Sequence, residues 1–192
     1  MAARTPRQTA AESCETVMTV PADLWEGTLA ELHLRGAGER ESGAFLLARR
    51  DDGNRSGVAV EVVAAAYYDD LDAECLTGGI TMSGSAYDVL WRRCADEQLV
   101  VVADVHTHPR TWVGQSHIDS ANPMMAFAGH IALIIGRFAE PEVALAQVGM
   151  YRYVGKRQWE QLETEQCLRI EPAPQPKGRG LLARWLRRWW RP

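Results

Sequence analysis

The chain has 192 residues, 46% of them hydrophobic, which fits one globular domain with extensions and gives it enough core to fold independently. No run reaches about 18 apolar residues and the N-terminus lacks an apolar signal core, so we expect a cytoplasmic protein without a membrane-spanning helix. Residues 168–192 hold seven Lys or Arg against one Glu, so the rest of the chain must be near −10 to give the net charge of −4.

Two classes of function are disfavoured by residue type. The acidic body argues against nucleic acid as a partner, because affinity for phosphates depends on Lys and Arg that displace counterions. Zinc-ribbon, thioredoxin-like and nucleobase deaminase sites are also disfavoured, because no Cys-x-x-Cys pair occurs among Cys14, Cys75, Cys94 and Cys167. Free thiols are therefore expected.

The first part of the chain predicts an arm, a strand and a helix. Residues 1–15 are polar and without periodicity, which indicates a flexible arm. Residues 17–20 indicate a short strand. Residues 21–34 have the apolar spacing of an amphipathic helix, which we expect to end at the glycines of residues 36–38.

A β-hairpin and a second helix follow. Residues 43–49 and 58–68 are apolar runs on either side of a segment rich in turn residues, which predicts two paired strands. The acidic residues 69–79 are predicted to form a solvated loop, and the alternative is a negative rim that guides a basic substrate tail. Residues 83–98 predict a helix with one face formed by Tyr87, Leu90, Trp91 and Cys94.

The strongest functional signal is the stretch from Asp104 to Asp119. His106 and His108 end a buried apolar run, and a strand's period of two places both rings on the same face. Seven residues separate His108 from Ser116, and Asp119 follows three later, so the chain can return and present a carboxylate from the first turn of a helix. Two histidines and a carboxylate leave one position open, as catalytic zinc requires.

A purely structural interpretation of this stretch is also open, with two histidines ending a buried strand and Ser116-x-x-Asp119 acting as a capping box. Another residue favours the metal. Glu41 stands at the mouth of the apolar run 41–48, where an unpaired carboxylate is costly unless something holds it. A water molecule bound to a metal ion is a good candidate for that partner.

These segments, Glu41-Ser-Gly, His106-Thr-His108-Pro and Ser116-x-x-Asp119, resemble the JAMM motif of the JAB/MPN family of zinc isopeptidases, over roughly residues 17–152. The resemblance implies that Zn²⁺ is bound by His106, His108 and Asp119. It also implies that Glu41 is the general acid/base and that Ser116 stabilises the oxyanion. The implied activity is that of a deubiquitinase-like metalloprotease, which cleaves after the C-terminus of a ubiquitin-like protein in a prokaryotic conjugation or antiphage defence system.

Two other classes stay open. One is a zinc peptidase that trims sulfur-carrier proteins or acts on small peptides. The other is a non-catalytic scaffold with the same MPN fold, which the intact ligand set disfavours. Metal content separates the scaffold from the enzymes.

The second half of the chain predicts one helical turn at 117–121 and a new helix with Asn122 as cap and Pro123 at its first position. Strands are predicted at 130–136 and 143–153, with His130 as a structural residue, and a last helix at 158–168. Helices before, between and after strands indicate an α/β domain with a mixed sheet. The resemblance adds a curved sheet flanked by helices, in the cytidine deaminase-like JAB/MPN architecture.

The predicted organisation is an arm at 1–15, a JAB/MPN metalloprotease domain at 16–170, a Pro/Gly linker at 171–180 and a basic Trp-rich tail at 181–192. The tail places Leu and Trp on one helical stripe and four Arg opposite, as in surface-seeking amphipathic helices. It could dock on its own domain or a second copy, in the groove of a partner protein, or, least favoured, on an anionic membrane surface.

Overall fold

The computed structural model describes residues 18–51, 59–76 and 79–172 of the chain. The predicted arm at 1–15, most of the predicted linker and the basic tail at 181–192 lie outside these residues, as does the turn of the predicted hairpin at 52–58. The predictions for these segments stay predictions.

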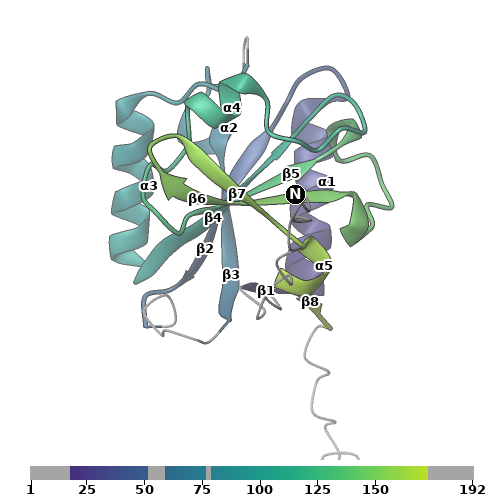
Figure 1. Cartoon of the computed structure of the whole chain (residues 1–192). Helices are drawn as coiled ribbons and strands as arrows, with labels where there is room; N and C mark the ends of the chain where they lie inside the picture. The colour runs from purple at the N-terminus through teal and green to yellow at the C-terminus, as the bar shows by residue number, and fades with distance from the viewer. Residues whose placement is uncertain (1–17, 52–58, 77–78, 173–192) are drawn as a thin grey trace, which may run out of the picture.

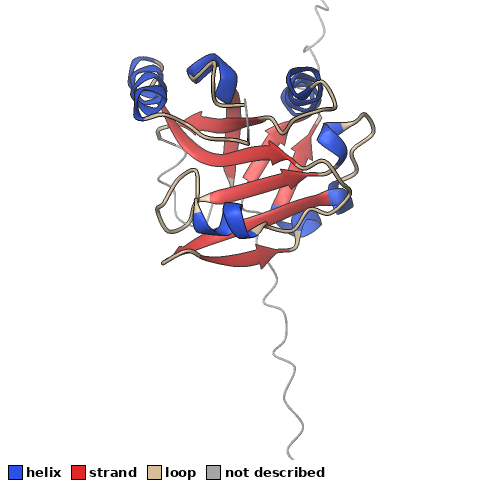
Figure 2. Cartoon of the chain, turned by 90° about the horizontal axis from the view of Figure 1, so that it is seen from above, coloured by secondary structure: helices blue, strands red, loops and turns tan. Residues whose placement is uncertain are grey.

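The described residues form one mixed, curved sheet with the strand order β7-β6-β5-β4-β2-β3-β1-β8 (Figures 1 and 2). The pairs β1–β3, β1–β8 and β4–β5 are parallel, and the other neighbours are antiparallel. This confirms the predicted α/β domain with a mixed sheet. The strands are β1 Met18–Pro21, β2 Gly43–Arg49, β3 Val60–Tyr67, β4 Leu99–Thr107, β5 Ile131–Ile135, β6 Val148–Gly155, β7 Gln158–Leu162 and β8 Leu168–Glu171.

Helices and two 3₁₀ turns, η1 and η2, connect these strands. No helix in the described part of the chain is both long and apolar enough to cross a membrane. The elements are α1 Ala22–Gly36, α2 Tyr68–Leu71, α3 Gly84–Asp96, α4 His117–Ala121, α5 Thr164–Cys167, η1 Arg137–Ala139 and η2 Leu145–Gln147.

The two long helices, α1 and α3, cover opposite faces of the central strands (Figure 1). Alternation along β2 explains this arrangement, because Ala44 and Leu46 pack in the core cluster of α1, whereas Phe45 and Leu47 pack in that of α3. β2 is therefore buried on both faces, as its continuous apolar run predicts. Its neighbour β4, which carries the two histidines, lies in the middle of the sheet.

The predicted last helix at 158–168 is wrong. The chain turns back at Gly155, Lys156 and Arg157, which have φ of +94°, +53° and +59°, and β7 then pairs antiparallel with β6. Only the short helix α5 remains of the predicted one, and β8 pairs with β1 at the far edge of the sheet. Strand pairing, with adjacent β6 for β7 and with distant β1 for β8, outweighs the local helical spacing here.

The helix predicted to begin at Asn122 is also wrong. Within the described residues α4 ends at Ala121, Asn122 is its C-cap, and the segment 123–130 is irregular. Met125 is buried, and the Tyr87 hydroxyl donates to the carbonyl of Met124, so tertiary contacts fix this segment.

Three smaller predictions are corrected. Trp91, predicted on the buried face of α3, is 45% exposed. The strand predicted from residue 143 begins only at Val148, after η2. Cys75 and Cys94 are free thiols as expected, but Cys167 is disulfide-bonded.

Candidate metal centre

Two histidines project from the end of the central strand. His106 pairs with Gly43 of β2 on one side and with Ile134 of β5 on the other, so its backbone is fixed within the sheet. His108 follows the last residue of β4, and its N–H donates to the carbonyl of Ile135. Both side chains are buried, and their Nε2 atoms lie 3.3 Å apart. The structure thus brings the two rings together, as the strand period predicts.

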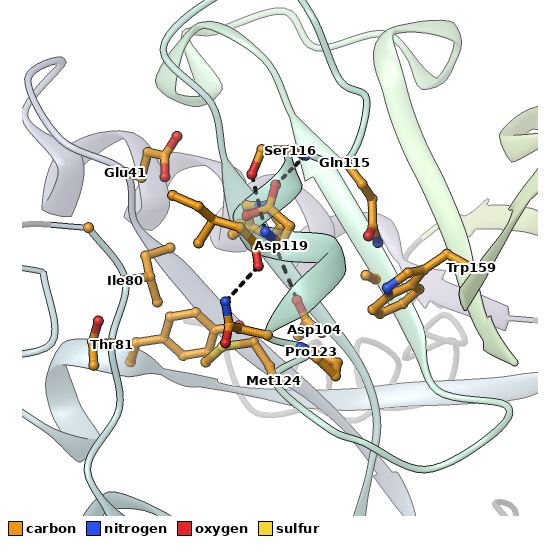
Figure 3. Close-up of a pocket in the computed structure, with 16 residues that line it drawn as sticks. Glu41, Ile80, Thr81, Asp104, Gln115, Ser116, Asp119, Pro123, Met124 and Trp159 are labelled. Atoms are coloured by element: carbon orange, nitrogen blue, oxygen red, sulfur yellow. Dashed lines mark hydrogen bonds and ion pairs between the residues drawn. The ribbon is translucent and has the colours of Figure 1, made fainter. Parts of the chain in front are cut away.

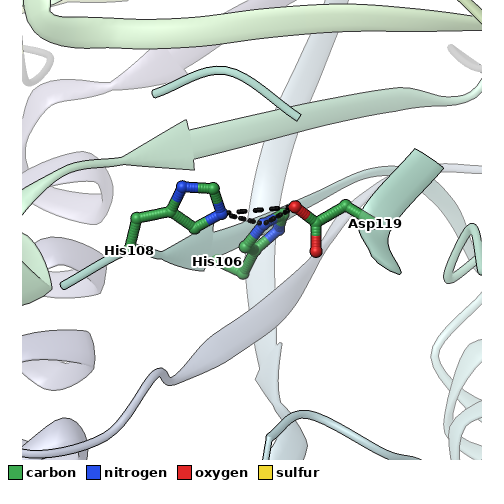
Figure 4. A group of neighbouring side chains, drawn as sticks. All are labelled: His106, His108 and Asp119. Atoms are coloured by element: carbon green, nitrogen blue, oxygen red, sulfur yellow. Dashed lines mark hydrogen bonds and ion pairs between the residues drawn. The ribbon is translucent and has the colours of Figure 1, made fainter. Parts of the chain in front are cut away.

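Asp119 reaches the histidines from α4. Ser116 caps this helix in a reciprocal capping box, in which the Asp119 N–H donates to Ser116 Oγ and the Ser116 N–H donates to the Asp119 carboxylate. Oδ2 of that carboxylate lies 3.3 Å from Nε2 of His108 and 3.9 Å from Nε2 of His106 (Figure 4). The capping box aims the carboxylate at the histidines, so a structural role and a ligand role are compatible in Asp119.

The three side chains form a cluster that could hold a metal ion. Their ligand atoms lie within 4.8 Å of one another. Ligands about 2.0–2.1 Å from a tetrahedral ion lie roughly 3.3 Å apart, and two of the three separations have this value. Imidazole nitrogen and carboxylate oxygen are both zinc ligands. The donor set therefore fits zinc with one position left open.

Glu41 is held beside the cluster by the residue that follows it. The Ser42 N–H donates to Thr107 Oγ1, and the Thr107 N–H donates to the Ser42 carbonyl, each at 2.9 Å. Thr107 stands between the two histidines, so these bonds tie the Glu41 segment to the strand that carries them.

Glu41 and Ser116 line two adjoining cavities. The larger, of about 450 Å³, extends from Asp119 to Trp159 (Figure 3). The smaller, of about 320 Å³, lies beside Trp112. Glu41 and Ser116 are shared by both linings. All five residues predicted for the site are therefore gathered around one surface.

The loop 109–115, between the histidines and α4, rests on two glycines. A Cβ at Gly136 would lie 2.8 Å from the carbonyl oxygen of Arg110, and one at Gly149 would lie 2.1 Å from that of Val113. The Tyr151 hydroxyl also donates to the Val113 carbonyl. The loop can approach β5 and β6 this closely only because the two glycines lack a side chain.

The local charges favour the ionised form of Asp119. Burial acts to raise the pKa of Asp119, but its contacts with His108, His106 and Ser116 hold that pKa far below the usual value. Burial acts to lower the pKa of His106, yet Asp104 and the other nearby carboxylates leave it raised. A metal ion must therefore compete with a proton at His106.

Sequence reasoning assigned no role to Asp104 and only a structural one to His130. Asp104 Oδ1 lies 2.6 Å from Nε2 of His130, and its Oδ2 lies 3.6 Å from Nδ1 of His106. A carboxylate in a buried strand, two residues before a candidate ligand, was the signal available for Asp104. The sequence also did not predict that Trp159 lines the larger cavity, because it predicted a helix where β7 forms.

The acidic segment 69–79 is largely engaged within the chain. Arg35 of α1 contacts the carboxylates of Asp69 and Asp70 at 2.7 and 2.8 Å. Asp72 accepts a hydrogen bond from the N–H of Ser83, the N-cap of α3. The loop prediction is wrong for residues 69–71, which belong to helix α2. Gly79 of the same segment lines the larger cavity, so the rim that guides a substrate tail stays a prediction.

No family model matches the chain. Among solved structures it is similar to protein DSY2949 from Desulfitobacterium hafniense, with a TM-score of 0.56 and 21% identity over 81% of this chain and 95% of that one. A protein from Salinibacter ruber gives a TM-score of 0.53 and 19% identity over 82% of this chain and 95% of that one. These two likenesses show the fold alone. A JAB1/MPN domain protein, AF2198 from Archaeoglobus fulgidus, gives a TM-score of 0.43 and 13% identity over 81% of this chain and 98% of that one, which is too low to support an inference.

Proposed function

We propose that the chain is a zinc-dependent isopeptidase or peptidase that cleaves after the C-terminus of a ubiquitin-like protein. The observation that carries this proposal is the convergence of His106, His108 and Asp119 from separate elements, with Glu41 and Ser116 on the walls of the adjoining cavities. The same five residues form the JAMM-like motif in the sequence. Spacing along the chain and proximity in space therefore support the same assignment.

Each residue has a distinct role in amide hydrolysis. A zinc ion held by the cluster would supply a Lewis acid that lowers the pKa of a water molecule towards about 7 and polarises the scissile carbonyl. Glu41 takes the proton as water adds to the carbonyl carbon, and returns it to the departing amine when the carbon–nitrogen bond breaks. The Ser116 oxygen already accepts the Asp119 N–H, so its hydroxyl hydrogen stays available to donate to the oxyanion.

The shape of the surface around Glu41 and Ser116 suits an extended substrate. The cavities on either side of Glu41 and Ser116 offer space for chain on both sides of the scissile bond. Exposed apolar side chains flank them, with Trp112 57% and Ile118 70% exposed. A flexible C-terminal tail joined to an amine would lie across such a surface. The prokaryotic conjugation or defence setting rests on the motif resemblance alone.

The test is cleavage by the zinc-loaded protein of a ubiquitin-like protein that carries a short C-terminal extension. We expect about one zinc per chain, cleavage at the junction, and loss of cleavage with retained zinc in Glu41→Ala. If the protein cleaves only short peptides or sulfur-carrier fusions, its activity is that of the alternative zinc peptidase. Zinc binding without any hydrolysis, or absence of zinc, would overturn the proposal in favour of a scaffold.

A further inference from the structure

The residues beneath His106 form a second layer that the proposed reaction does not use. Asp104, His106 and His130 are all buried, with exposures of 2%, 7% and 0%. They come from two neighbouring strands, since Asp104 and His106 lie in β4 and His130 directly precedes β5. An ionised carboxylate at such depth is costly unless each oxygen has a partner.

The Asp104 carboxylate bridges two imidazole rings. One oxygen lies 2.6 Å from His130 Nε2 and the other 3.6 Å from His106 Nδ1. His106 therefore presents Nδ1 to the carboxylate and Nε2 to His108 and Asp119. The distance to His106 is that of an ion pair and exceeds a hydrogen bond, but a carboxylate this close favours the proton on Nδ1 and so leaves Nε2 free for a metal ion.

The side chain of His130 has no other hydrogen bond within the described residues. Its Nδ1 is buried without a hydrogen-bond partner, and its ring meets the edge of Phe127 with centroids 5.3 Å apart. The bond to Asp104 is thus the one polar interaction that accounts for a fully buried histidine here. By occupying one carboxylate oxygen, His130 restricts the rotation of Asp104 and leaves the other oxygen facing His106.

We propose that Asp104 is a positioning residue for the ligand His106, and that His130 in turn orients Asp104. This inference rests on the proposed metal centre. The chain His130–Asp104–His106 has the chemistry of a carboxylate–histidine–metal triad, extended by one further imidazole. His108 has a neutral outer partner instead, because its Nδ1 lies 3.2 Å from the backbone carbonyl oxygen of Trp112.

The experiment compares zinc affinity, by chelator competition, in the wild type and in Asp104→Asn, His130→Leu and His130→Gln. Loss of an outer partner typically weakens a metal site by about 10–100-fold, and we expect this for Asp104→Asn. His130→Leu should weaken binding less, and His130→Gln should restore part of the loss because its amide can still donate to Asp104. The double variant Asp104→Asn/His130→Leu should bind no worse than Asp104→Asn alone, because His130 acts through Asp104.

The matched control is Thr28→Val, which removes a buried hydroxyl in α1 that donates to the carbonyl of Leu24, away from the cluster. It should lower the melting temperature of the metal-free protein and leave zinc affinity within about twofold. The Co²⁺-loaded proteins provide a second readout, since a displaced imidazole changes the ligand-field spectrum. Wild-type affinity and spectrum in Asp104→Asn would overturn the inference while leaving the metal centre intact. A wild-type protein that binds neither metal would overturn both.

Discussion

The two histidines of the candidate metal centre are anchored in different ways. On the sheet side, His106 lies within β4 between two neighbouring strands, with Asp104 and His130 beneath it. On the loop side, residues 108–119 carry His108, Ser116 and Asp119 beyond the end of the sheet. The sheet side is fixed by the fold as a whole, whereas the loop side depends on a capping box, a tyrosine and two glycine contacts. Changes on the loop side should therefore alter the site with less cost to the fold.

Removing a ligand from either side should have the largest effect on activity. The two substitutions should differ in how much they lower the free energy of unfolding. His106→Ala and Asp119→Ala are both expected to lose zinc, and cleavage should fall by roughly 10³-fold or more. Without metal, Asp119→Ala should cost about 1 kcal/mol, because the Ser116 N–H loses the carboxylate that completes the capping box. His106→Ala should cost about 3 kcal/mol or more, because it removes one of the two imidazole partners of the buried Asp104 carboxylate.

Zinc analysis and denaturant unfolding in chelator check this pair of variants. Equal destabilisation by the two substitutions would contradict the proposed difference between the sheet side and the loop side.

Ser116→Ala tests the loop side without removing a ligand. Zinc should stay bound, and kcat should fall by roughly 100-fold, the usual order for losing one oxyanion donor. The control is Ser120→Ala in the same helix, whose hydroxyl donates to the Ser116 carbonyl. It should leave kcat near the wild-type value. Similar losses in both variants would indicate that helix α4, and not the Ser116 hydroxyl, limits the reaction.

Gly149→Ala should displace the loop side while leaving β4 in place. The added Cβ would meet the carbonyl oxygen of Val113 at 2.1 Å, so backbone must move, at a cost of about 1–3 kcal/mol. We expect weaker zinc binding together with a lower melting temperature. Gly27→Ala, in α1 with open space around its Cβ, should instead be neutral or stabilising. Unchanged zinc affinity in Gly149→Ala would show that the loop contact does not position the ligands.

Features encoded in short segments could be predicted from the sequence. The apolar run from Gly43 to Arg49 predicted β2. The pattern Ser116-x-x-Asp119 predicted the one-turn helix α4 with its capping box. The spacing of His106, His108 and Asp119 predicted a cluster that the structure does bring together. These predictions agree with the structure because strand alternation and helix capping depend only on residues close together in the sequence.

Features that depend on distant partners could not be predicted. Gln158–Leu162 has helical spacing, yet it forms β7 in a hairpin with the adjacent strand β6, and that hairpin packs at the edge of a sheet whose other strands are distant in the sequence. His130 contacts Asp104 only because β5 lies beside and parallel to β4. No local sequence pattern predicts that strand order. The cavity wall at Trp159 follows from the pairing of β7 with β6.

The raised pKa of His106 gives zinc binding a pH dependence with a defined direction. Proton and metal compete for the ring, so affinity should fall by about tenfold per pH unit once the pH is below the His106 pKa. Since that pKa is raised from 6.5, the loss should begin above pH 6.5, and Asp119, whose pKa is lowered, stays ionised throughout.

The metal-free protein should show the opposite trend in stability. A raised pKa contributes stability below the unfolded value and loses that contribution as pH rises through the folded pKa. Chelator competition and thermal unfolding between about pH 5.5 and 8.5 measure both trends. A flat zinc affinity across this window would contradict the role of His106 as a ligand.

The smallest effect is expected from deleting residues 178–192, because every residue of the sheet side and the loop side lies upstream of residue 172. Zinc content and cleavage of a small fusion substrate should stay within about twofold of the full chain, as expected for a segment beyond the predicted Pro/Gly linker. Sedimentation of both forms, with and without anionic vesicles, separates the docking modes. A mass change indicates self-association, and vesicle binding lost on deletion indicates the membrane. Replacing Arg184, Arg187, Arg188 and Arg191 with Gln distinguishes charge-driven docking from docking by the Trp and Leu stripe. Loss of activity towards even the small substrate would make the tail part of the catalytic fold and would move the domain boundary beyond residue 171.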